Sequence, residues 1–248
     1  LAAAAEALKA AQRPMIIAGG GVQYSGAVAE LTGFAEAHDI PVVETIAGRA
    51  NMLATHPLNI GPVGVTGSDS ANAVAERADV VLAVGTRLQD FTTGSWSLFA
   101  PDARFIGLNT ARFDATKHQS LAVVGDAKVS LEELGAALGD WQAPASWREH
   151  GQALYAKWNA YVDQRSGPTN AELPTYAHVV GAVNRIASER DLALTAAGGM
   201  PGELSMNWKA KGVGTFDCEF GFSCMGYEIA GGWGAAMADP SRDTFVMV

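Results

Sequence analysis

The chain has 248 residues, of which 48% are hydrophobic, and a formal net charge of −9 at pH 7. A chain of this length can bury one large core or two ordinary ones, and we expect two domains. The acidic balance argues against nucleic acid and anionic membrane surfaces as partners, because both attract positively charged proteins. Cys218 and Cys224 have neither zinc-binding nor redox-motif spacing, which favours a reducing, cytoplasmic location.

Residues 1–140 alternate segments of helical period with short β-branched segments, the pattern of a parallel sheet covered by helices. The predicted elements, in chain order, are a helix over 2–12, strands over 15–18 and 41–45 around a helix over 25–38, a helix over 69–78, strands over 79–85, 104–109 and 121–126, and a helix over 127–138. Ser25 is the expected N-cap of the second helix, and residues 19–21 form a glycine turn. Because residues 79–85 are apolar on both faces, they belong in the middle of the sheet. The pattern predicts one doubly wound α/β domain.

Residues 141–170 mix aromatic and charged residues, and we expect a linker that packs across a surface. Residues 171–248 resume the alternation and predict the first part of a second, truncated α/β domain. Its expected elements are a helix over 175–189, a strand over 192–196, a turn over 196–203, a strand over 213–216, a helix ending at 237 and a strand over 244–248. The first of these helices is expected to bury Val179, Val183 and Ile186. The apolar last residues lack a cap or a polar tail, so we expect a piece of a longer polypeptide.

Glycine-rich turns follow three predicted strands, and such turns can present backbone N–H groups to an anion. They cover residues 18–26, 82–90 and 195–203. The first turn is close to the glycine motif that binds dinucleotides, but Tyr24 replaces the third glycine of that motif. The acidic residue that normally binds the ribose could only be Glu44. Two interpretations therefore stay open, a plain turn and a site for FAD or NAD. Arg87 is either a ligand contact at the end of a strand or a surface arginine paired with Asp90.

Metal ligands and nucleophiles are not evident. His56 and His118 lie in predicted loops with no second ligand at metal-binding spacing, so we expect surface histidines. Cys224 has no histidine near it in sequence, and we expect a packing role. The sequence assigns no catalytic residue and no metal ligand.

Two segments of the second half resemble a known family. Residues 195–204 read TAAGGMPGEL and residues 223–235 read SCMGYEIAGGWGA. Together they resemble the diphosphate-binding domain of thiamine-diphosphate-dependent enzymes. Residues 1–140 resemble, segment by segment, the central domain of the acetohydroxyacid-synthase-like members. The resemblance therefore covers essentially the whole chain.

The resemblance implies thiamine diphosphate as cofactor, which reacts through a C2 carbanion when its two rings are folded together. The cofactor-binding residues that it implies are Gly198, Gly199, Met200 and Pro201 on the diphosphate side, and Ser223, Cys224, Met225 and Gly226 on the pyrimidine side. Met225 matches the wedge that folds the rings, and thioethers pack well against π faces. By resemblance, the Ser223 carbonyl accepts from the 4′-amino group and the Met225 N–H donates to N3′.

Five glycines around this segment have expected roles in close approach. Gly221 and Gly226 would let the backbone approach the cofactor, and Gly231, Gly232 and Gly234 would let the following helix pack closely on its neighbour. The alternative interpretation of the whole segment, without a cofactor, is a helix packed tightly on a sheet.

Within the family, the sequence resembles the branch of hydrolases that open a cyclic trihydroxycyclohexanedione in myo-inositol breakdown. Glu228 stands where synthases usually have glycine, and Ala230 where they have proline. The product implied is a 5-deoxyglucuronate-type acid. The alternatives are a synthase or decarboxylase acting on 2-oxo acids, a non-catalytic FAD- or NAD-binding module, and a structural platform for subunit contacts.

Two parts of the family's active site have no counterpart in residues 1–248. They are the Gly-Asp-Gly…Asn segment that holds Mg²⁺ and the diphosphate, and the activating glutamate of an N-terminal domain. The resemblance therefore implies Mg²⁺ ligands outside these residues and, because family active sites are shared between subunits, a homodimer or homotetramer. We expect residues 1–248 alone to be inactive.

Overall fold

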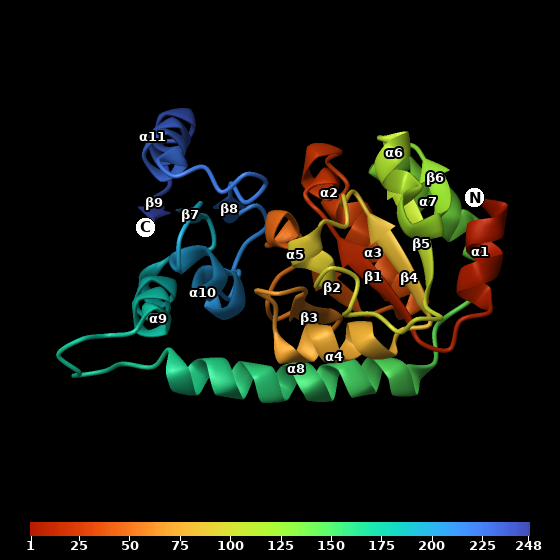
Figure 1. Cartoon of the computed structure of the whole chain (residues 1–248), viewed down its shortest axis with the longest axis horizontal. Helices are drawn as coiled ribbons and strands as arrows, with labels where there is room; N and C mark the ends of the chain where they lie inside the picture. The colour runs from red at the N-terminus through yellow and green to blue at the C-terminus, as the bar shows by residue number, and fades with distance from the viewer.

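The computed structural model describes residues 1–248 and contains two parallel β-sheets (Figure 1). The six-stranded sheet has the order β3-β2-β1-β4-β5-β6, and the three-stranded sheet has the order β8-β7-β9. Helices cover both faces of the six-stranded sheet. The predicted α/β class, with a doubly wound sheet followed by a smaller α/β unit, is confirmed.

The first part of the chain builds the six-stranded sheet. Its strands are β1 (Pro14–Ala18), β2 (Val42–Glu44), β3 (Asn59–Pro62), β4 (Val80–Val84), β5 (Arg104–Asn109) and β6 (Leu121–Val124). The helices and 3-10 turns between them are α1 (Ala2–Lys9), α2 (Gly21–Tyr24), α3 (Val28–His38), η1 (Ile46–Gly48), α4 (Asp69–Arg77), α5 (Asp90–Thr93), α6 (Arg112–Ala115), η2 (Lys117–Gln119) and α7 (Ala127–Leu138).

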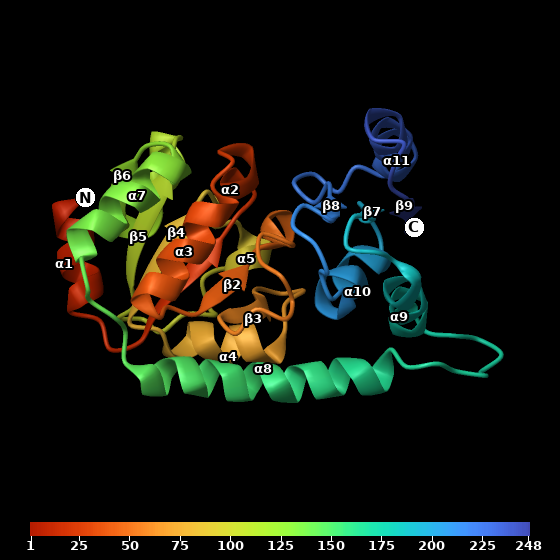
Figure 2. The same ribbon diagram turned by 180° about the vertical axis from the view of Figure 1, so that it is seen from behind.

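The two central strands have buried residues at every position, as the apolar run over 79–85 predicts. Successive side chains point to opposite faces, so Ile16 and Leu82 join the core under α1, α3 and α7, whereas Ile17 and Val81 join the core under α4. Figures 1 and 2 show these helices on the two faces of the sheet. This two-sided burial explains why β1 and β4 lie at the centre.

The residues expected to form a linker contain a 21-residue helix, α8 (Ala145–Arg165), which runs along α4 toward the three-stranded sheet (Figure 2). Trp147 and Trp158 are buried along it. The Trp147 Nε1–H donates to the Pro14 carbonyl at 2.8 Å, which fixes the helix to the start of β1. A Cβ at Gly151 would lie 3.1 Å from the Ile60 side chain, so the absence of a side chain there permits the close packing.

The second part of the chain builds the three-stranded sheet. Its elements are α9 (Tyr176–Ile186), β7 (Leu192–Thr195), α10 (Met200–Asn207), β8 (Phe216–Cys218), α11 (Tyr227–Ala238) and β9 (Thr244–Val246). In Figure 1, α9 and α10 lie on one side of these strands and α11 lies on the other. No helix of the chain combines the length and the apolar character needed to cross a membrane.

Several local predictions are wrong. Ser25 is not the N-cap of the second helix. It is the C-cap of the short helix α2, and α3 begins only at Val28, with Ala27 as its N-cap. In α9, Ala177 and Val180 are buried, and Val183 is partly buried against the same core. Val179 and Ile186 are exposed, so of the three side chains expected in the core only Val183 faces it.

The sequence pattern predicts neither α8 nor the short helices α2, η1, α5, α6 and η2, and it also misses β3 and α10. β3 has the sequence Asn-Ile-Gly-Pro, which lacks a β-branched run, and α10 begins inside the expected turn over 196–203.

The two parts of the chain meet through a buried arginine. Ile46 and Ala50, which follow β2 in the chain, pack into the core of the three-stranded unit. Between them Arg49, 4% exposed, pairs with the Glu44 carboxylate and donates from Nη2 to the Trp208 carbonyl at 2.6 Å. Burial raises the pKa of Glu44, and the charge of Arg49 opposes that rise. A buried charge pair therefore joins the two units.

Candidate functional site

The two predicted cofactor-binding segments lie at the same edge of the three-stranded sheet. The turn of residues 196–199 follows β7 and leads into α10, and the loop of residues 219–226 follows β8 and leads into α11. β7 and β8 pair in parallel, with Thr195 opposite Cys218, so their carboxyl ends coincide. Ligands of open α/β sheets bind at this edge. We call the first segment the 196–199 turn and the second the 219–226 loop.

One carboxylate joins these segments. Glu228, at the start of α11, is only 4% exposed. Its Oε1 accepts from the Ala197 N–H at 3.0 Å, and its Oε2 accepts from the Gly226 N–H at 3.0 Å. The backbone amides, that of Ala197 first, lower the pKa of Glu228, so it is ionised at neutral pH. From the sequence, Glu228 stood out only because synthases usually have glycine at that position. Its hydrogen bonds to both segments were not predicted.

A second carboxylate organises the 219–226 loop from within. Glu219 Oε1 accepts from the Phe222 N–H at 3.1 Å, and Oε2 accepts from the Cys224 N–H at 2.7 Å. These bonds lower the pKa of Glu219, the Cys224 amide contributing most. The loop is thus held by two acidic side chains that face its amides at alternate positions.

Those bonds leave other backbone groups of the loop without a partner in the chain, the Ser223 N–H among them. The carbonyl of Ser223 and the N–H of Met225 make no hydrogen bond within the chain, while the amides of Phe222, Cys224 and Gly226 are all occupied. An acceptor and a donor therefore lie two residues apart on the exposed side of the loop. Met225 itself is 88% exposed.

The 196–199 turn also offers free donors. The amides of Gly198 and Gly199 donate to no group of the chain, and both precede the N-terminus of α10, where anions are favoured. Gly198 and Gly226 have φ of +97° and +93°, a conformation that favours glycine, and a Cβ on either would meet no atom within 4 Å. Met200 and Pro201 are buried in the first turn of α10, so they contribute backbone rather than side chain to this edge.

The glycines of α11 have different surroundings. A Cβ at Gly232 would lie 2.3 Å from Val246 of β9, and one at Gly231 would lie 2.9 Å from the Tyr227 ring. A Cβ at Gly234 would meet nothing, so its expected packing role is wrong. Gly221 lies beside Arg87, whose Nη2 would be 3.3 Å from an added Cβ.

Gly232 and Gly234 of α11 give a matched test of helix packing. Replacing Gly232 by alanine is expected to lower the free energy of unfolding by about 1–3 kcal/mol, because Val246 or α11 must move. Replacing Gly234 by alanine is expected to raise it by roughly 0.5–1 kcal/mol through helix propensity. Chemical unfolding followed by circular dichroism measures both changes, and equal effects would contradict the packing shown for Gly232.

Of the remaining candidate residues, Cys224 lies in the 219–226 loop itself, whereas His56 and His118 lie away from this edge. Cys224 is exposed, so the packing role expected for it is wrong, and its contact with Glu219 raises the pKa of its thiol. His56 contacts the Glu36 carboxylate at 3.1 Å, and His118 stacks on Trp96.

The first glycine turn borders a cavity of about 300 Å³. It lies where the strand order reverses between β1 and β4, the usual ligand position of such sheets. Arg87 is exposed at its rim and forms no ion pair, so the alternative in which it pairs with Asp90 is wrong. Glu44 is bound by Arg49 and by the Met52 N–H, so it cannot serve as the acid of a dinucleotide fingerprint.

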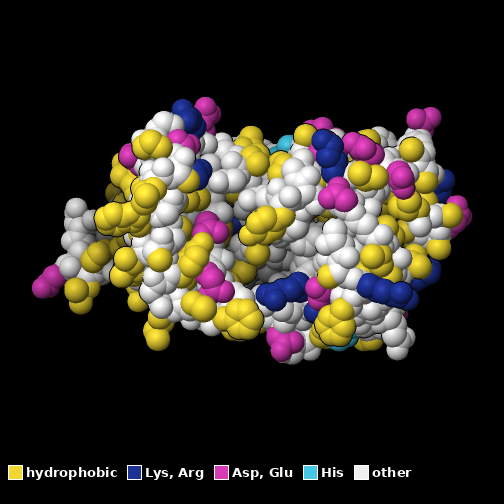
Figure 3. Space-filling model, turned by 90° about the horizontal axis from the view of Figure 1, so that it is seen from above, with side chains coloured by type: hydrophobic (Ala, Val, Ile, Leu, Met, Phe, Trp, Pro, Cys, Tyr) yellow, Lys and Arg dark blue, Asp and Glu magenta, His cyan; other side chains and the backbone are white.

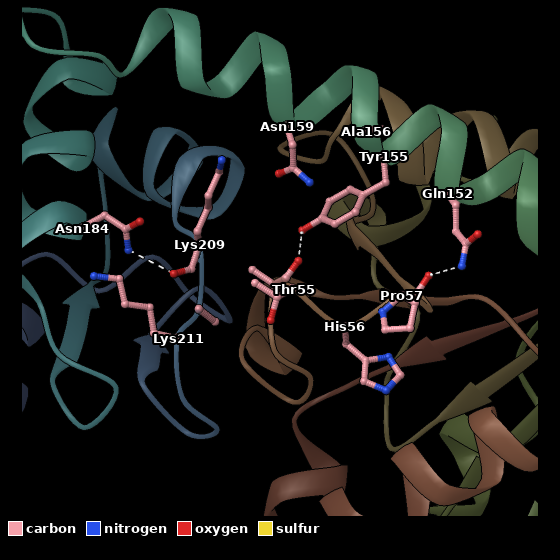
Figure 4. Close-up of a pocket in the computed structure, with 12 residues that line it drawn as sticks. Thr55, His56, Pro57, Gln152, Tyr155, Ala156, Asn159, Asn184, Lys209 and Lys211 are labelled. Carbon is pink, nitrogen blue, oxygen red and sulfur yellow. Dashed lines mark hydrogen bonds between the residues drawn. The ribbon is translucent and has the colours of Figure 1, made fainter.

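A larger cavity of about 700 Å³ lies between α8, residues 54–57 and residues 209–211 (Figure 4). None of the predicted site residues lines it. The hydroxyl of Tyr155 donates to the Ala54 carbonyl at 3.2 Å, and the amide of Asn184 donates to the Lys209 carbonyl at 3.0 Å. These bonds satisfy groups within the chain, and nothing in the lining indicates a particular ligand.

Comparison with known proteins identifies the family. The family model described as "Thiamine pyrophosphate enzyme, central domain" matches residues 1–134, more than half of the chain. The chain belongs to the thiamine pyrophosphate enzyme family. Membership implies thiamine diphosphate, the same compound as thiamine pyrophosphate, as the cofactor.

Relatives of this thiamine pyrophosphate enzyme chain match along its whole length. It is 36% identical to the 3D-(3,5/4)-trihydroxycyclohexane-1,2-dione hydrolase of Geobacillus thermodenitrificans (strain NG80-2), with 99% of this chain and 42% of the relative covered. It is 35% identical to the protein of the same name from Bacillus anthracis (strain CDC 684 / NRRL 3495), with 100% and 42% covered. The chain thus spans about two fifths of the length of these relatives.

The residues at the sheet edge fit the family's cofactor. An aminopyrimidine carries an amino donor beside a ring-nitrogen acceptor, which complements the free Ser223 carbonyl and Met225 N–H. A diphosphate is an anion, which complements the free amides of Gly198 and Gly199. For the metal, no group of three or more His, Cys, Asp or Glu side chains in residues 1–248 is arranged to hold an ion.

The ionisation of Glu228 makes the stability of this edge depend on pH. A carboxyl group whose pKa is lower in the folded state stabilises the fold above its unfolded pKa of about 4.3, and this contribution is lost as pH falls through the folded pKa. In Glu228→Gln, the acid-induced loss of stability is expected to be shallower below about pH 4.3. Melting temperatures measured between neutral and acidic pH test this; parallel curves for the two proteins would contradict it.

Proposed function

We propose that the chain is part of a thiamine-diphosphate-dependent hydrolase that cleaves a C–C bond of a cyclic 1,2-dione. The names of the relatives support hydrolysis and the substrate class, a trihydroxycyclohexane-1,2-dione. The 5-deoxyglucuronate-type product and the place in myo-inositol degradation are part of the proposal. The observation that carries the proposal is the pair of free backbone groups, the Ser223 carbonyl and the Met225 N–H, with the Cys224 and Gly226 amides next to Met225 both occupied.

Each part of the edge has a proposed role. The Ser223 carbonyl and Met225 N–H bind the aminopyrimidine, and the exposed Met225 side chain supports the folded cofactor. The 196–199 turn and the start of α10 bind the diphosphate side. When bound, thiamine diphosphate supplies a nucleophilic carbon for the cleavage. We propose that Mg²⁺ is held by residues outside positions 1–248.

The domain division is also a proposal. Residues 1–140 form a central domain, residues 141–170 connect it, and residues 171–248 form the first part of the diphosphate-binding domain. Exposed apolar side chains on α11, Ile229, Trp233 and Met237, support assembly into a homodimer or homotetramer. Figure 3 shows hydrophobic side chains gathered over the end of the molecule that carries α11. We place the enzyme in the cytoplasm, in keeping with its free cysteines.

The full-length protein tests the proposal. With Mg²⁺ and thiamine diphosphate, we expect opening of the cyclic dione ring and little turnover of pyruvate, and no activity from residues 1–248 alone. Release of the acid product is measured by chromatography. Faster turnover of pyruvate than of the dione would favour the synthase or decarboxylase alternative; activity of residues 1–248 alone would contradict the need for residues outside them.

The cavity between β1 and β4 favours a second candidate, nucleotide binding by the six-stranded unit. It lies at the reversal of strand order and has the exposed Arg87 at its rim. An absorbance band of flavin in the purified full-length protein would support this candidate, whereas a colourless protein that binds neither FAD nor NAD in calorimetry would dismiss it.

A further inference from the structure

Glu228 is the only side chain that hydrogen-bonds to both cofactor-binding segments. Its two oxygens are each 3.0 Å from a backbone nitrogen, one in the 196–199 turn and one in the 219–226 loop. Glu219 bonds only to the loop. The relative position of the two segments at this edge is therefore set through one carboxylate.

The carboxylate is itself held by the packing of α11. Gly232 follows Glu228 by one helical turn, on the same face, and both are buried. The backbone of Gly232 lies so close to Val246 that a Cβ there would be 2.3 Å from the valine side chain. The helix is thus fixed on β9, and its buried face presents Glu228 to the end of β7. Small movements of the carboxylate relative to the sheet are restricted.

We propose that Glu228 is a positioning residue that sets the distance between the diphosphate-binding turn and the pyrimidine-binding loop, so that a single thiamine diphosphate engages both. The inference rests on the proposed function. By accepting from Ala197 and Gly226, the carboxylate occupies the amides that flank the free ones. The free Gly198 N–H and Met225 N–H are therefore each next to an amide that the carboxylate holds.

The experiment distinguishes two roles of Glu228: setting the distance between the two segments, and stabilising the site in general. Thiamine diphosphate needs both segments at once, whereas pyrophosphate alone needs only the turn and thiamine alone needs only the loop. In the full-length protein with Mg²⁺, Glu228→Gln is expected to weaken thiamine diphosphate binding at least tenfold in calorimetry. The dissociation constants of pyrophosphate and of thiamine, measured separately, are expected to change less than about threefold, because each segment alone stays able to bind.

Three variants complete the experiment. Glu228→Ala, which removes both bonds, is expected to show a larger loss for thiamine diphosphate than Glu228→Gln, which keeps one acceptor oxygen. Glu219→Gln is expected to weaken thiamine and thiamine diphosphate together and to leave pyrophosphate unchanged, because it orders the loop alone. Glu132→Gln, an exposed position on α7, is the control for loss of one negative charge.

The outcomes decide the inference. A selective loss for thiamine diphosphate in the Glu228 variants supports it. Unchanged binding of all three ligands, or an equal loss for all three, overturns it, since the residue would then be dispensable or merely structural. If the unaltered full-length protein does not bind thiamine diphosphate, the proposed function fails first and the inference fails with it.

Discussion

Replacing Arg49 by methionine is expected to lower the free energy of unfolding by about 3–5 kcal/mol. The change removes the partner of Glu44, which is completely buried, and leaves an uncompensated carboxylate between the two units. It also removes the bond to the Trp208 carbonyl. Because Ile46 and Ala50 on either side of Arg49 belong to the core of the three-stranded unit, the loss is expected to affect both units.

Urea-induced unfolding, followed by tryptophan fluorescence and by circular dichroism, measures this loss. Arg190→Met is the matched control, since Arg190 is exposed and its nearest carboxylate oxygen, on Asp239, is 3.9 Å away. In the double variant Glu44→Gln/Arg49→Met, part of the lost stability is expected to return, because no buried charge then lacks a partner. A decrease for Arg49→Met no larger than for Arg190→Met would refute the role of the buried pair.

Replacing Met225 by alanine is expected to lower kcat/KM of the full-length enzyme at least tenfold while its stability changes by no more than about 0.5 kcal/mol. The side chain is 88% exposed and packs against little of the chain, so its removal costs no core packing. Under the proposed function, its contribution is to the folded shape of the bound cofactor. Steady-state kinetics at saturating cofactor, together with thermal melts, separate the two effects.

Leu173→Ala provides the control for this experiment. Leu173 is 85% exposed and lies between α8 and α9, outside both cofactor-binding segments. We expect this variant to retain the kcat/KM of the unaltered enzyme. Equal activity of Met225→Ala and Leu173→Ala would remove Met225 from the proposed cofactor site.

The architecture of the six-stranded sheet was predictable because its strands and helices carry strong local patterns. The apolar run that contains β4 and the helical period of α7 both give the observed elements. β3 has no such pattern and is recruited by pairing with β2 in the sheet. The core-facing side of α9 was predicted only in part: Val183 packs on the core, but Val179 and Val180 are equally apolar, and only packing against α10 decides between them.

The candidate site was predictable only in part. The resemblance points to the 196–199 turn and the 219–226 loop, and the structure places both at one edge of the sheet. The bridge between them could not be read from sequence, because Glu228 and Ala197 are 31 residues apart and a glutamate in a helix is ordinarily exposed. The nearest available signal was that Glu228 stands where related synthases have glycine.

Two carboxylates that bond to backbone amides explain how the 219–226 loop contains two residues of unusual conformation. Ser223 has φ of +50° and Gly226 has φ of +93°, in the left-handed region. Such conformations persist where the surroundings fix them, and here Glu219 and Glu228 supply the fixing bonds. The chain's own carboxylates thus supply the hydrogen bonds that fix these conformations.

The central claim is that thiamine diphosphate binds at the edge formed by the 196–199 turn and the 219–226 loop. A crystal structure of the full-length protein with thiamine diphosphate and Mg²⁺ tests it most directly. We predict the N3′ atom within hydrogen-bonding distance of the Met225 nitrogen and the 4′-amino group within the same reach of the Ser223 carbonyl. A cofactor found in the cavity between β1 and β4, or with its pyrimidine away from Met225, would contradict the account.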